Sequence, residues 1–501
     1  MGTNGYASIQ LVDNGGAAIV VPSQSVQFVV GCASQGPIGT IVATRSPQTL
    51  NNTFGWGPGV EAAALACVAG GTVLFCRATA NTAGTATAVT HTGTGVSVMT
   101  VTGAPFDTYY VEVLVLANGT IATGPCLIQI SLDAGRTFSP TINLGTATTY
   151  AIAGTGMTLN FTTATIVAGD TYQFSTSEPL WNDAGLSVAF AALQASPYAQ
   201  QGFGSVHIVG KAAGSDATFV GGPTTGLLEA WAAAVAPLFS QAIMSARDVV
   251  APVAWGGAGE TESTWITSIL TDYTAVSAKR VSVCAAYYNQ ASALITPLGV
   301  VNQARRSVAY AVAARTVQPG FTPNRSWGRV KLGPMPFLIN PAKDSQDGFV
   351  YHDEAINPGL NAGRFVSTTS RAYLQGRYIL QANNVASTGA QISSWPLIAV
   401  ASVAETILIQ VGQQSINDDV RLLKSGLMDP RDVATIQKGL QSAIDSNMTA
   451  QQMISSAQVV VDGSQNLITN NGQVPVTCTL VQRSIILQVN ITLQYVNPAQ
   501  A

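Results

Sequence analysis

The chain has 501 residues, a length that usually corresponds to several domains. Only 9% of them are Asp, Glu, Lys or Arg, whereas about 25% is usual in soluble proteins. The net charge of −3 argues against a general nucleic-acid-binding protein, which would carry a basic surface. Hydrophobic residues reach 47%, yet no uninterrupted apolar run approaches the ~20 residues that span a bilayer, so we expect no membrane insertion.

The scarcity of charge favours a protein that buries much of its surface against identical neighbours, because the cores of interfaces are depleted of charged residues. A neutral globular protein is the alternative. The six cysteines contain no CxxC pair and mostly lie in apolar runs, which indicates buried thiols. Disulfides between subunits, formed after release of the assembled particle, are the second interpretation for Cys32, Cys67, Cys76, Cys126, Cys284 and Cys478.

The N-terminal part indicates an α/β core. Residues 17–22 and 26–30 are short, β-branched runs bounded by Gly and Pro, as in strands. Residues 59–69 predict a helix of small side chains, which ends at Gly70-Gly71 and is followed by a strand over 72–76. Alternation of strands and helices is typical of α/β proteins.

The composition changes at residue 81. Residues 81–177 contain five charged side chains and are dense in Thr, Gly and Val. Short runs that resemble strands recur there, separated by turns, which predicts a β-sandwich or small barrel inserted into the core. The predicted strands cover residues 96–101, 109–116, 127–132, 157–161 and 171–174.

The α/β pattern returns after Pro179. We predict strands over 206–210, 249–253 and 281–286, and helices over 226–245, 265–277 and 297–314. A second boundary lies near Trp395, beyond which we predict helices over 398–410, 418–425 and 430–446 and then strands. The expected fold class is therefore a multidomain α/β protein with an inserted all-β domain, an α+β C-terminal domain and extended terminal arms. The expected boundaries are an N-terminal arm 1–22, a core 23–80 and 178–394, an insert 81–177, a C-terminal domain 395–482 and a C-terminal arm 483–501.

The last segment alternates strictly between apolar and polar residues, which predicts a half-buried strand. Its apolar residues are Leu487, Val489, Ile491, Leu493 and Tyr495. Five buried side chains contribute about 8–15 kcal/mol before entropy costs. No charge occurs from residue 484 to 501, so the strand lacks the charged residues that normally protect an exposed edge. We expect it to pair with a sheet of another copy; a final strand of its own domain is the alternative. The uncharged run with Ala17, Ile19, Val20 and Val21 allows the same two interpretations.

Motifs for catalysis are missing from the sequence, so no enzyme activity and no cofactor or metal is expected. There is no phosphate-binding loop, no GxGxxG, no HExxH and no GxSxG motif. The cluster His352-Asp353-Glu354 is interpreted as a solvated or interface loop, because neighbours on an extended segment point in opposite directions. Four basic residues near predicted helices form either a solvated face or a contact with an acidic partner: Arg421, Lys424, Arg431 and Lys438.

Three segments resemble contractile bacteriophage tail sheath proteins. The first contains Phe28-Val29-Val30-Gly31 with Gly36-Pro37, then Phe54-Gly55 and Gly70-Gly71-Thr72, and it ends at Arg77. The second contains His352-Asp353-Glu354, Asn357-Pro358-Gly359-Leu360, Arg364-Phe365 and Gly376-Arg377-Tyr378. The third is the closing strand over 489–495.

The resemblance implies a structural subunit that polymerises as stacked helical rings around an inner tail tube and contracts to drive the tube through the host envelope. It also implies contacts with the tail tube, baseplate and tail terminator proteins, a place in the virion tail, and assembly in the host bacterial cytoplasm. The four basic residues would then be candidates to face the tube, and the β-rich insert would face outward. A β-rich surface-layer or tail-fibre adhesin is the alternative function, favoured by the Thr- and Gly-rich insert but not by the α/β pattern of the core.

Overall fold

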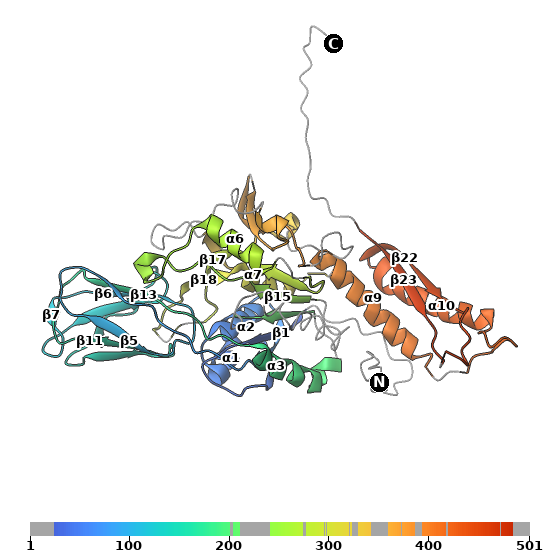
Figure 1. Ribbon diagram of the computed structural model, residues 1–501, viewed down its shortest axis with the longest axis horizontal. Coiled ribbons are helices and arrows are strands. Elements are labelled where there is room, and N and C mark those ends of the chain that lie inside the picture. Colours follow the sequence, from blue (N-terminus) through green and yellow to red (C-terminus); the bar gives the residue numbers. More distant parts are fainter. Residues whose placement is uncertain are drawn as a thin grey trace, which may run out of the picture. The chain divides into compact units, whose positions relative to one another are not determined.

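The computed structural model describes residues 25–200, 204–210, 241–273, 277–294, 296, 298–319, 321–322, 329–341, 359–371, 373–385, 393–416, 419–470 and 472–483. The chain divides into two compact units, Met1–Thr406 and Ile407–Ala501, so the division falls inside helix α9 (Trp395–Gln413) (Figure 1). By length and composition α9 would suffice to cross a bilayer. However, 56% of its most apolar stretch is buried within the protein, as in the core helix of a soluble protein.

A six-stranded sheet forms the centre of the first unit, and its strand order is β16-β15-β14-β1-β3-β2. All neighbours are parallel except the edge strand β2, which is antiparallel to β3. The strands are β1 (Val26–Gly31), β2 (Ile41–Thr44), β3 (Thr72–Arg77), β14 (Ser205–Ile208), β15 (Gln241–Ser245) and β16 (Val281–Cys284). The predicted strands over 26–30, 72–76, 206–210 and 281–286 are therefore confirmed in type, with shifts of one or two residues at their ends.

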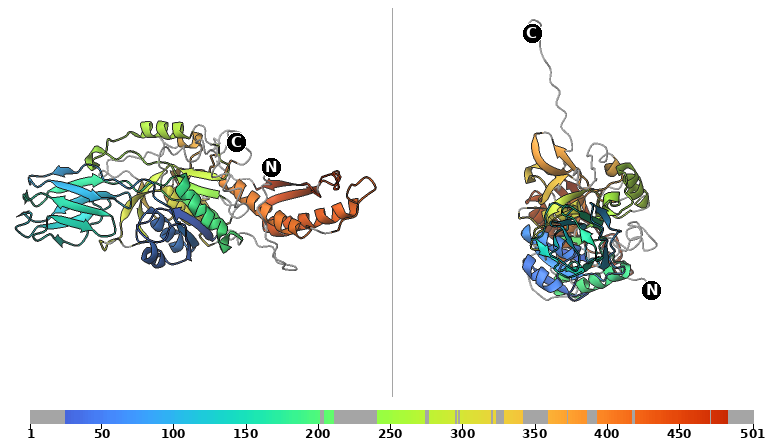
Figure 2. Two further views of the ribbon diagram at one scale, coloured as in Figure 1. Left: turned by 60° about the horizontal axis from the view of Figure 1, so that its bottom comes forward. Right: turned by 90° about the vertical axis from the view of Figure 1, so that its left-hand side faces the viewer.

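The central sheet is buried on both faces, as parallel sheets usually are. Val29 shares a hydrophobic cluster with α1 (Pro47–Phe54) and α2 (Pro58–Val68). Phe28, the neighbour of Val29, packs edge-on against Phe190 of α3 (Asp183–Ala195), with ring centroids 5.8 Å apart. The predicted helix over 59–69 is confirmed as α2, and α7 (Val308–Thr316) packs against it. Helices α1 and α2, blue in Figure 2, lie side by side.

Two antiparallel sheets form the β-rich part between β3 and α3. One has five strands, β4 (Thr90–Thr92), β13 (Thr171–Ser175), β6 (Tyr110–Val115), β8 (Leu127–Ser131) and β9 (Ile142–Asn143). The other has three, β10 (Thr149–Ile152), β11 (Met157–Phe161) and β5 (Met99–Gly103), and β7 (Gly119–Thr120) pairs separately with β12 (Thr165–Ile166). Inward side chains of both sheets, such as Val113 and Leu159, belong to one hydrophobic cluster. This part is therefore a β-sandwich.

Several predicted elements of the first unit are wrong. Residues 241–245 form strand β15 instead of the end of a helix, and residues 249–253 form no strand. The predicted helix over 297–314 is confirmed only in its last part, as α7, because residues 303–307 form strand β18. The predicted helix over 265–277 is confirmed as α6, although α6 begins at Glu262 and ends at Asp272. The remaining elements are η1 (Pro197–Gln200), η2 (Val253–Trp255), α6 (Glu262–Asp272), β17 (Tyr287–Ala291), β18 (Gln303–Ser307), η3 (Val330–Leu332), β19 (Leu338–Pro341), β20 (Thr368–Arg371) and β21 (Leu374–Ile379).

The second unit contains the end of α9, then α10 (Pro430–Ile444), a π-helical turn η4 (Asp445–Thr449) and the antiparallel pair β22 (Ile454–Val461) and β23 (Val476–Gln482). The predicted helix over 430–446 is confirmed. The predicted helix over 418–425 is wrong, because none of the described residues 419–425 is helical and Leu423–Gly426 form a turn, in which the φ of Gly426 is 80°. Leu422 pairs with Met428 across this turn in an isolated bridge.

Candidate assembly surface

Helix α10 and the β22–β23 sheet form a small layer of their own. Asp429 caps the helix, because its carboxylate accepts a hydrogen bond of 2.8 Å from the backbone N–H of Arg431, and Pro430 occupies the first turn. The helix packs against β22. Leu440 and Ile444 of α10 are buried, as are Val459 and Val461 of β22, so the two elements share a hydrophobic core.

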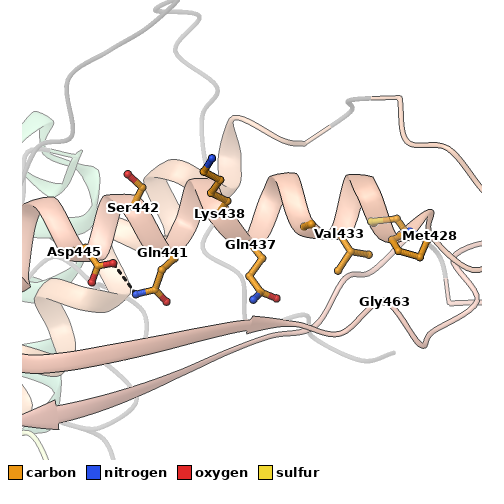
Figure 3. Close-up of a pocket in the computed structure, with 10 residues that line it drawn as sticks. Met428, Val433, Gln437, Lys438, Gln441, Ser442, Asp445 and Gly463 are labelled. Carbon is orange, nitrogen blue, oxygen red and sulfur yellow. Dashed lines mark hydrogen bonds between the residues drawn. The ribbon is translucent and has the colours of Figure 1, made fainter.

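The edge of β22 that faces away from β23 is covered by two glutamines of α10 (Figure 3). Oε1 of Gln441 accepts a hydrogen bond of 2.8 Å from the N–H of Val459, and Oε1 of Gln437 accepts one of 3.3 Å from the N–H of Val461. Nε2 of Gln441 donates to the carbonyl of Ala457 at 3.1 Å. Because Gln437 and Gln441 are four residues apart, both lie on the same face of α10.

A groove of about 650 Å³ runs along α10 beside these glutamines. Its lining mixes apolar and polar side chains from α10 with residues from the segments before the helix and after β22 (Figure 3). The lining residues are Met428, Pro430, Val433, Ala434, Gln437, Lys438, Gln441, Ser442, Asp445 and Gly463.

The opposite edge of the sheet, along β23, has no strand beside it within the described chain. The face of the sheet that points away from α10 is exposed and partly apolar, since Val460 is 45% and Val481 is 51% exposed. The N–H and C=O groups of an unpaired edge are a template for strand addition, and this edge carries no charged side chain between Val476 and Gln482.

The four basic residues proposed for partner contacts do not lie on one helical face. Arg421 and Lys424 belong to the non-helical segment before α10, with Lys424 in its turn, and only Arg431 and Lys438 are on the helix. The guanidinium of Arg421 pairs with Asp432, with Nε 3.2 Å from both carboxylate oxygens. The pKa of Asp432 lies below its ordinary value, and the largest cause is the hydrogen bond that its carboxylate accepts from the side chain of Arg421. Part of the basic character of the segment is therefore neutralised internally.

The predicted terminal strands lie outside the described residues: Ala17, Ile19, Val20 and Val21 at the N-terminus, and Leu487, Val489, Ile491, Leu493 and Tyr495 at the C-terminus. So does the cluster His352-Asp353-Glu354. The six cysteines are free thiols in the protomer. Cys32, Cys67, Cys76, Cys126 and Cys284 are buried, and Cys478 on β23 is half-buried.

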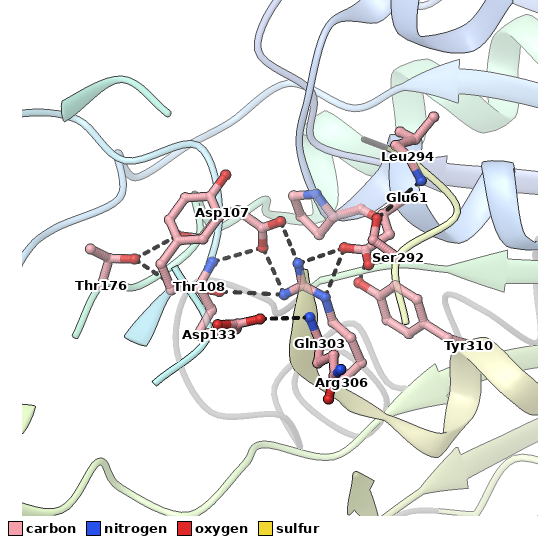
Figure 4. Close-up of polar contacts among 12 residues, drawn as sticks. Glu61, Asp107, Thr108, Asp133, Thr176, Ser292, Leu294, Gln303, Arg306 and Tyr310 are labelled. Carbon is pink, nitrogen blue, oxygen red and sulfur yellow. Dashed lines mark hydrogen bonds and ion pairs between the residues drawn. The ribbon is translucent and has the colours of Figure 1, made fainter. Parts of the chain in front are cut away.

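A buried ionic cluster joins the β-sandwich to the α/β core, and nothing in the sequence pattern predicted it (Figure 4). The guanidinium of Arg306 in β18 contacts Glu61 of α2 at 2.6 Å and Asp107, in the loop before β6, at 2.6 Å. All three side chains are buried. Burial raises the pKa of Asp107 to about 7; Arg306 opposes this shift, and Glu61 and Glu178 add to it. A second link is the hydrogen bond of 2.8 Å from the N–H of Gln303 to Asp133.

No family model and no curated protein match the chain. Among solved structures, it is similar to a sheath tail protein from Desulfitobacterium hafniense, with 10% identity over 95% of this chain and 100% of that one and a TM-score of 0.42. A sheath tail protein from Listeria innocua has 12% identity over 93% of this chain and 96% of that one, with a TM-score of 0.41. The contracted helical sheath of the anti-feeding prophage has 9% identity over 99% of both chains, with a TM-score of 0.49.

Proposed function

We propose that this chain is the structural subunit of a contractile tail sheath. In this role it polymerises as a helical stack of rings around the inner tail tube and contracts to drive the tube through the host envelope. Its partners are further copies of itself, the tail tube protein, and baseplate and tail terminator proteins. Its place is the tail of a virion assembled in the host bacterial cytoplasm, and it performs no enzymatic reaction.

One observation carries the proposal: the small β22–β23 sheet has an uncharged edge with no described partner. The chain then continues into a charge-free segment that alternates between apolar and polar residues over 487–495. A strand-forming segment and a sheet edge of this kind are complementary, and strand addition would join neighbouring copies through main-chain hydrogen bonds. The uncharged run 17–21 is predicted from the sequence to form a second strand of the same character.

Linking subunits through terminal strands suits a machine whose subunits must move without separating. An extended arm changes direction at a few backbone torsions, whereas a packed body moves as a unit. The buried cluster of Glu61, Asp107 and Arg306 ties the sandwich to the core and supports such a rigid body. The energy for contraction would come from packing between subunits, in agreement with the lack of a phosphate-binding motif in the sequence. In this arrangement the sandwich faces outward.

Electron microscopy of the purified recombinant chain tests the proposal. We expect long, striated, hollow tubes. Monodisperse monomers at all protein concentrations would contradict the sheath function, and flat two-dimensional lattices would favour a surface-layer protein instead.

A further inference from the structure

The β-sandwich is connected to the α/β core by two chain segments that pair with each other. One segment follows β3 and the other precedes α3. Isolated antiparallel bridges join Thr82 to Leu180 and Ala86 to Thr176, so residues 82–86 and 176–180 form a narrow neck. A neck of this kind keeps the sandwich near the core but leaves its orientation to other contacts, because a change in a few backbone torsions is enough to alter it.

Contacts outside the neck fix that orientation. Trp255 of η2 in the core packs edge-on against Tyr110 of β6, with ring centroids 5.8 Å apart. The N–H of Gln303 in β18 donates to the carboxylate of Asp133 in the sandwich at 2.8 Å. The buried ionic cluster is a further contact between the two parts (Figure 4), and its carboxyl groups make it sensitive to pH.

The ionic cluster contains more carboxyl groups than cations among the described residues. Glu61 and Asp107 both bind the guanidinium of Arg306. Glu178, which is buried in the neck, adds a third negative charge that acts on Asp107. Oε1 of Glu61 is buried and has no hydrogen-bond partner in the described part of the chain. An excess of negative charge in a buried site favours the binding of a proton.

Two buried phenols complete the surroundings of Asp107. Tyr109 lies two residues further along the same segment, and Tyr310 of α7 lies beside Arg306, whose guanidinium carbon is 6.0 Å from the centroid of the ring. Burial raises the pKa of both phenols well above the ordinary value. They therefore stay neutral where carboxyl groups titrate, so the proton of the cluster is held by a carboxyl group.

We propose that docking of the sandwich on the core binds a proton at Asp107 and that undocking releases it to water, so that the orientation of the sandwich is held most firmly below neutral pH. Docking buries Asp107 beside Glu61 and Glu178, and the proton removes its repulsion with these two groups. Undocking exposes Asp107 to water, where it ionises. This inference concerns the protomer alone and does not rest on the proposed sheath function.

The expected pH dependence follows from the two states of Asp107. Burial raises its pKa to about 7 in the docked protein, against an ordinary value of 3.8. Between these two values undocking releases a proton, so the undocked fraction should increase about tenfold for each pH unit. Above about pH 7 Asp107 is ionised in both states, and the undocked fraction should level off.

Hydrogen exchange of the full chain at several pH values tests this inference. The reporter is the amide of Gln303, whose N–H is bonded across the junction, and mass spectrometry with electron-transfer fragmentation resolves it. After correction for the intrinsic exchange rate, its protection should fall about tenfold per pH unit from pH 5 to about pH 7 and then level off. The reference is the amide of Ile130, which is bonded to Oγ of Ser139 inside the sandwich at 3.0 Å and should stay better protected at every pH. Equal protection of the two amides would show that the junction opens only with the whole protomer, and would overturn the inference.

Two substitutions separate Asp107 from other titrating groups. Asp107→Asn preserves the size of the side chain but cannot take up the proton, so protection at Gln303 should lose its pH dependence. The matched control is Glu112→Gln, which removes a carboxylate of the sandwich that lies outside the cluster and binds Gln173, and the native pH dependence should remain. A pH dependence that persists in Asp107→Asn would overturn the inference.

A third variant retains an ionisable Asp107 and serves if Asp107→Asn does not fold. Glu61→Gln removes a negative charge that raises the pKa of Asp107, so protection at Gln303 should level off at a lower pH than in the native chain. An unchanged levelling-off would overturn the inference. So would protection at Gln303 that is independent of pH in the native chain.

Discussion

Arg306 and Asp107 meet through two parallel hydrogen bonds, from Nη1 to Oδ1 at 2.9 Å and from Nη2 to Oδ2 at 2.6 Å. One residue comes from strand β18 of the core and the other from the loop that enters β6 of the sandwich. Bidentate pairs of this kind fix orientation as well as distance. Since Glu61 of α2 binds the same guanidinium, one buried cation holds three separate parts of the chain together.

Removing the cation should destabilise the protein strongly. Arg306→Met keeps much of the side-chain volume but leaves Glu61 and Asp107 buried without their partner. Breaking a buried ionic contact in this way typically costs about 3–5 kcal/mol. We expect a loss of that size in the free energy of unfolding, measured by urea denaturation of the soluble protomer. The control is Arg421→Ala, which breaks an exposed pair with Asp432 and should leave the urea midpoint nearly unchanged. Equal effects of the two substitutions would contradict the role of the cluster.

Asp107 should make the protomer more stable as the pH falls. Its pKa is about 7 in the folded protein, raised by burial, against an ordinary value of 3.8. Between these two values the folded state binds more protons than the unfolded state, so the contribution of this group to stability increases from pH 7 toward pH 4. The test is urea unfolding at several pH values for the native chain and Asp107→Asn. The native chain should gain stability relative to the variant as the pH falls; parallel profiles would exclude this role for Asp107.

His207 should have the opposite effect. It lies in the centre of β14, packs edge-on against Tyr310 with ring centroids 5.4 Å apart, and has no hydrogen-bond partner at either ring nitrogen within the described chain. Burial lowers the pKa of His207 to about 3 from an ordinary 6.5. Between pH 6.5 and about pH 3 the unfolded state binds more protons at this residue than the folded state does. The free energy of unfolding therefore decreases as the pH is lowered, by up to about 1.4 kcal/mol per pH unit. His207→Leu should remove this slope in the same unfolding experiment. A variant whose slope equals that of the native chain would refute the assignment.

The parts of the fold that the sequence predicted well have strong local patterns. β1 and β11 are short β-branched or alternating runs, and α10 has both a cap and a clear apolar face. The errors occurred where tertiary partners decide the structure. Residues 303–307 contain Arg305 and Arg306, a charged pair that does not resemble a buried strand. They are buried in β18 because Asp248 and Glu61, distant in the sequence, bind them.

The candidate assembly surface was predicted only in part. The alternation of the terminal segment and its lack of charge are visible in the sequence, because period-two alternation is a local property. The strand that they indicate stays a prediction, since it lies outside the described residues. The sequence does not show that Gln437 and Gln441 cover the edge of β22. Their spacing is also that of any pair on an exposed helical face, and only the folded structure places β22 beside them. The basic segment was misplaced for a similar reason: Arg421 belongs to a non-helical segment that Asp432 anchors through a backbone hydrogen bond of 2.7 Å.

Removing the terminal segment should separate assembly from folding. A chain that ends at Arg483 keeps α10, β22 and β23 and all their described contacts, and it retains the bond from Arg483 to Gln452. We therefore expect a soluble protomer with the urea midpoint of the native chain. It should form no tubes in electron microscopy and should elute as a monomer in size-exclusion chromatography, because the strand over 487–495 is lost. The control ends at Val496, which retains that strand, and it should still assemble. Normal tubes from the shorter chain would mean that the copies are joined elsewhere, whereas an aggregated or unfolded product would mean that the segment completes its own protomer.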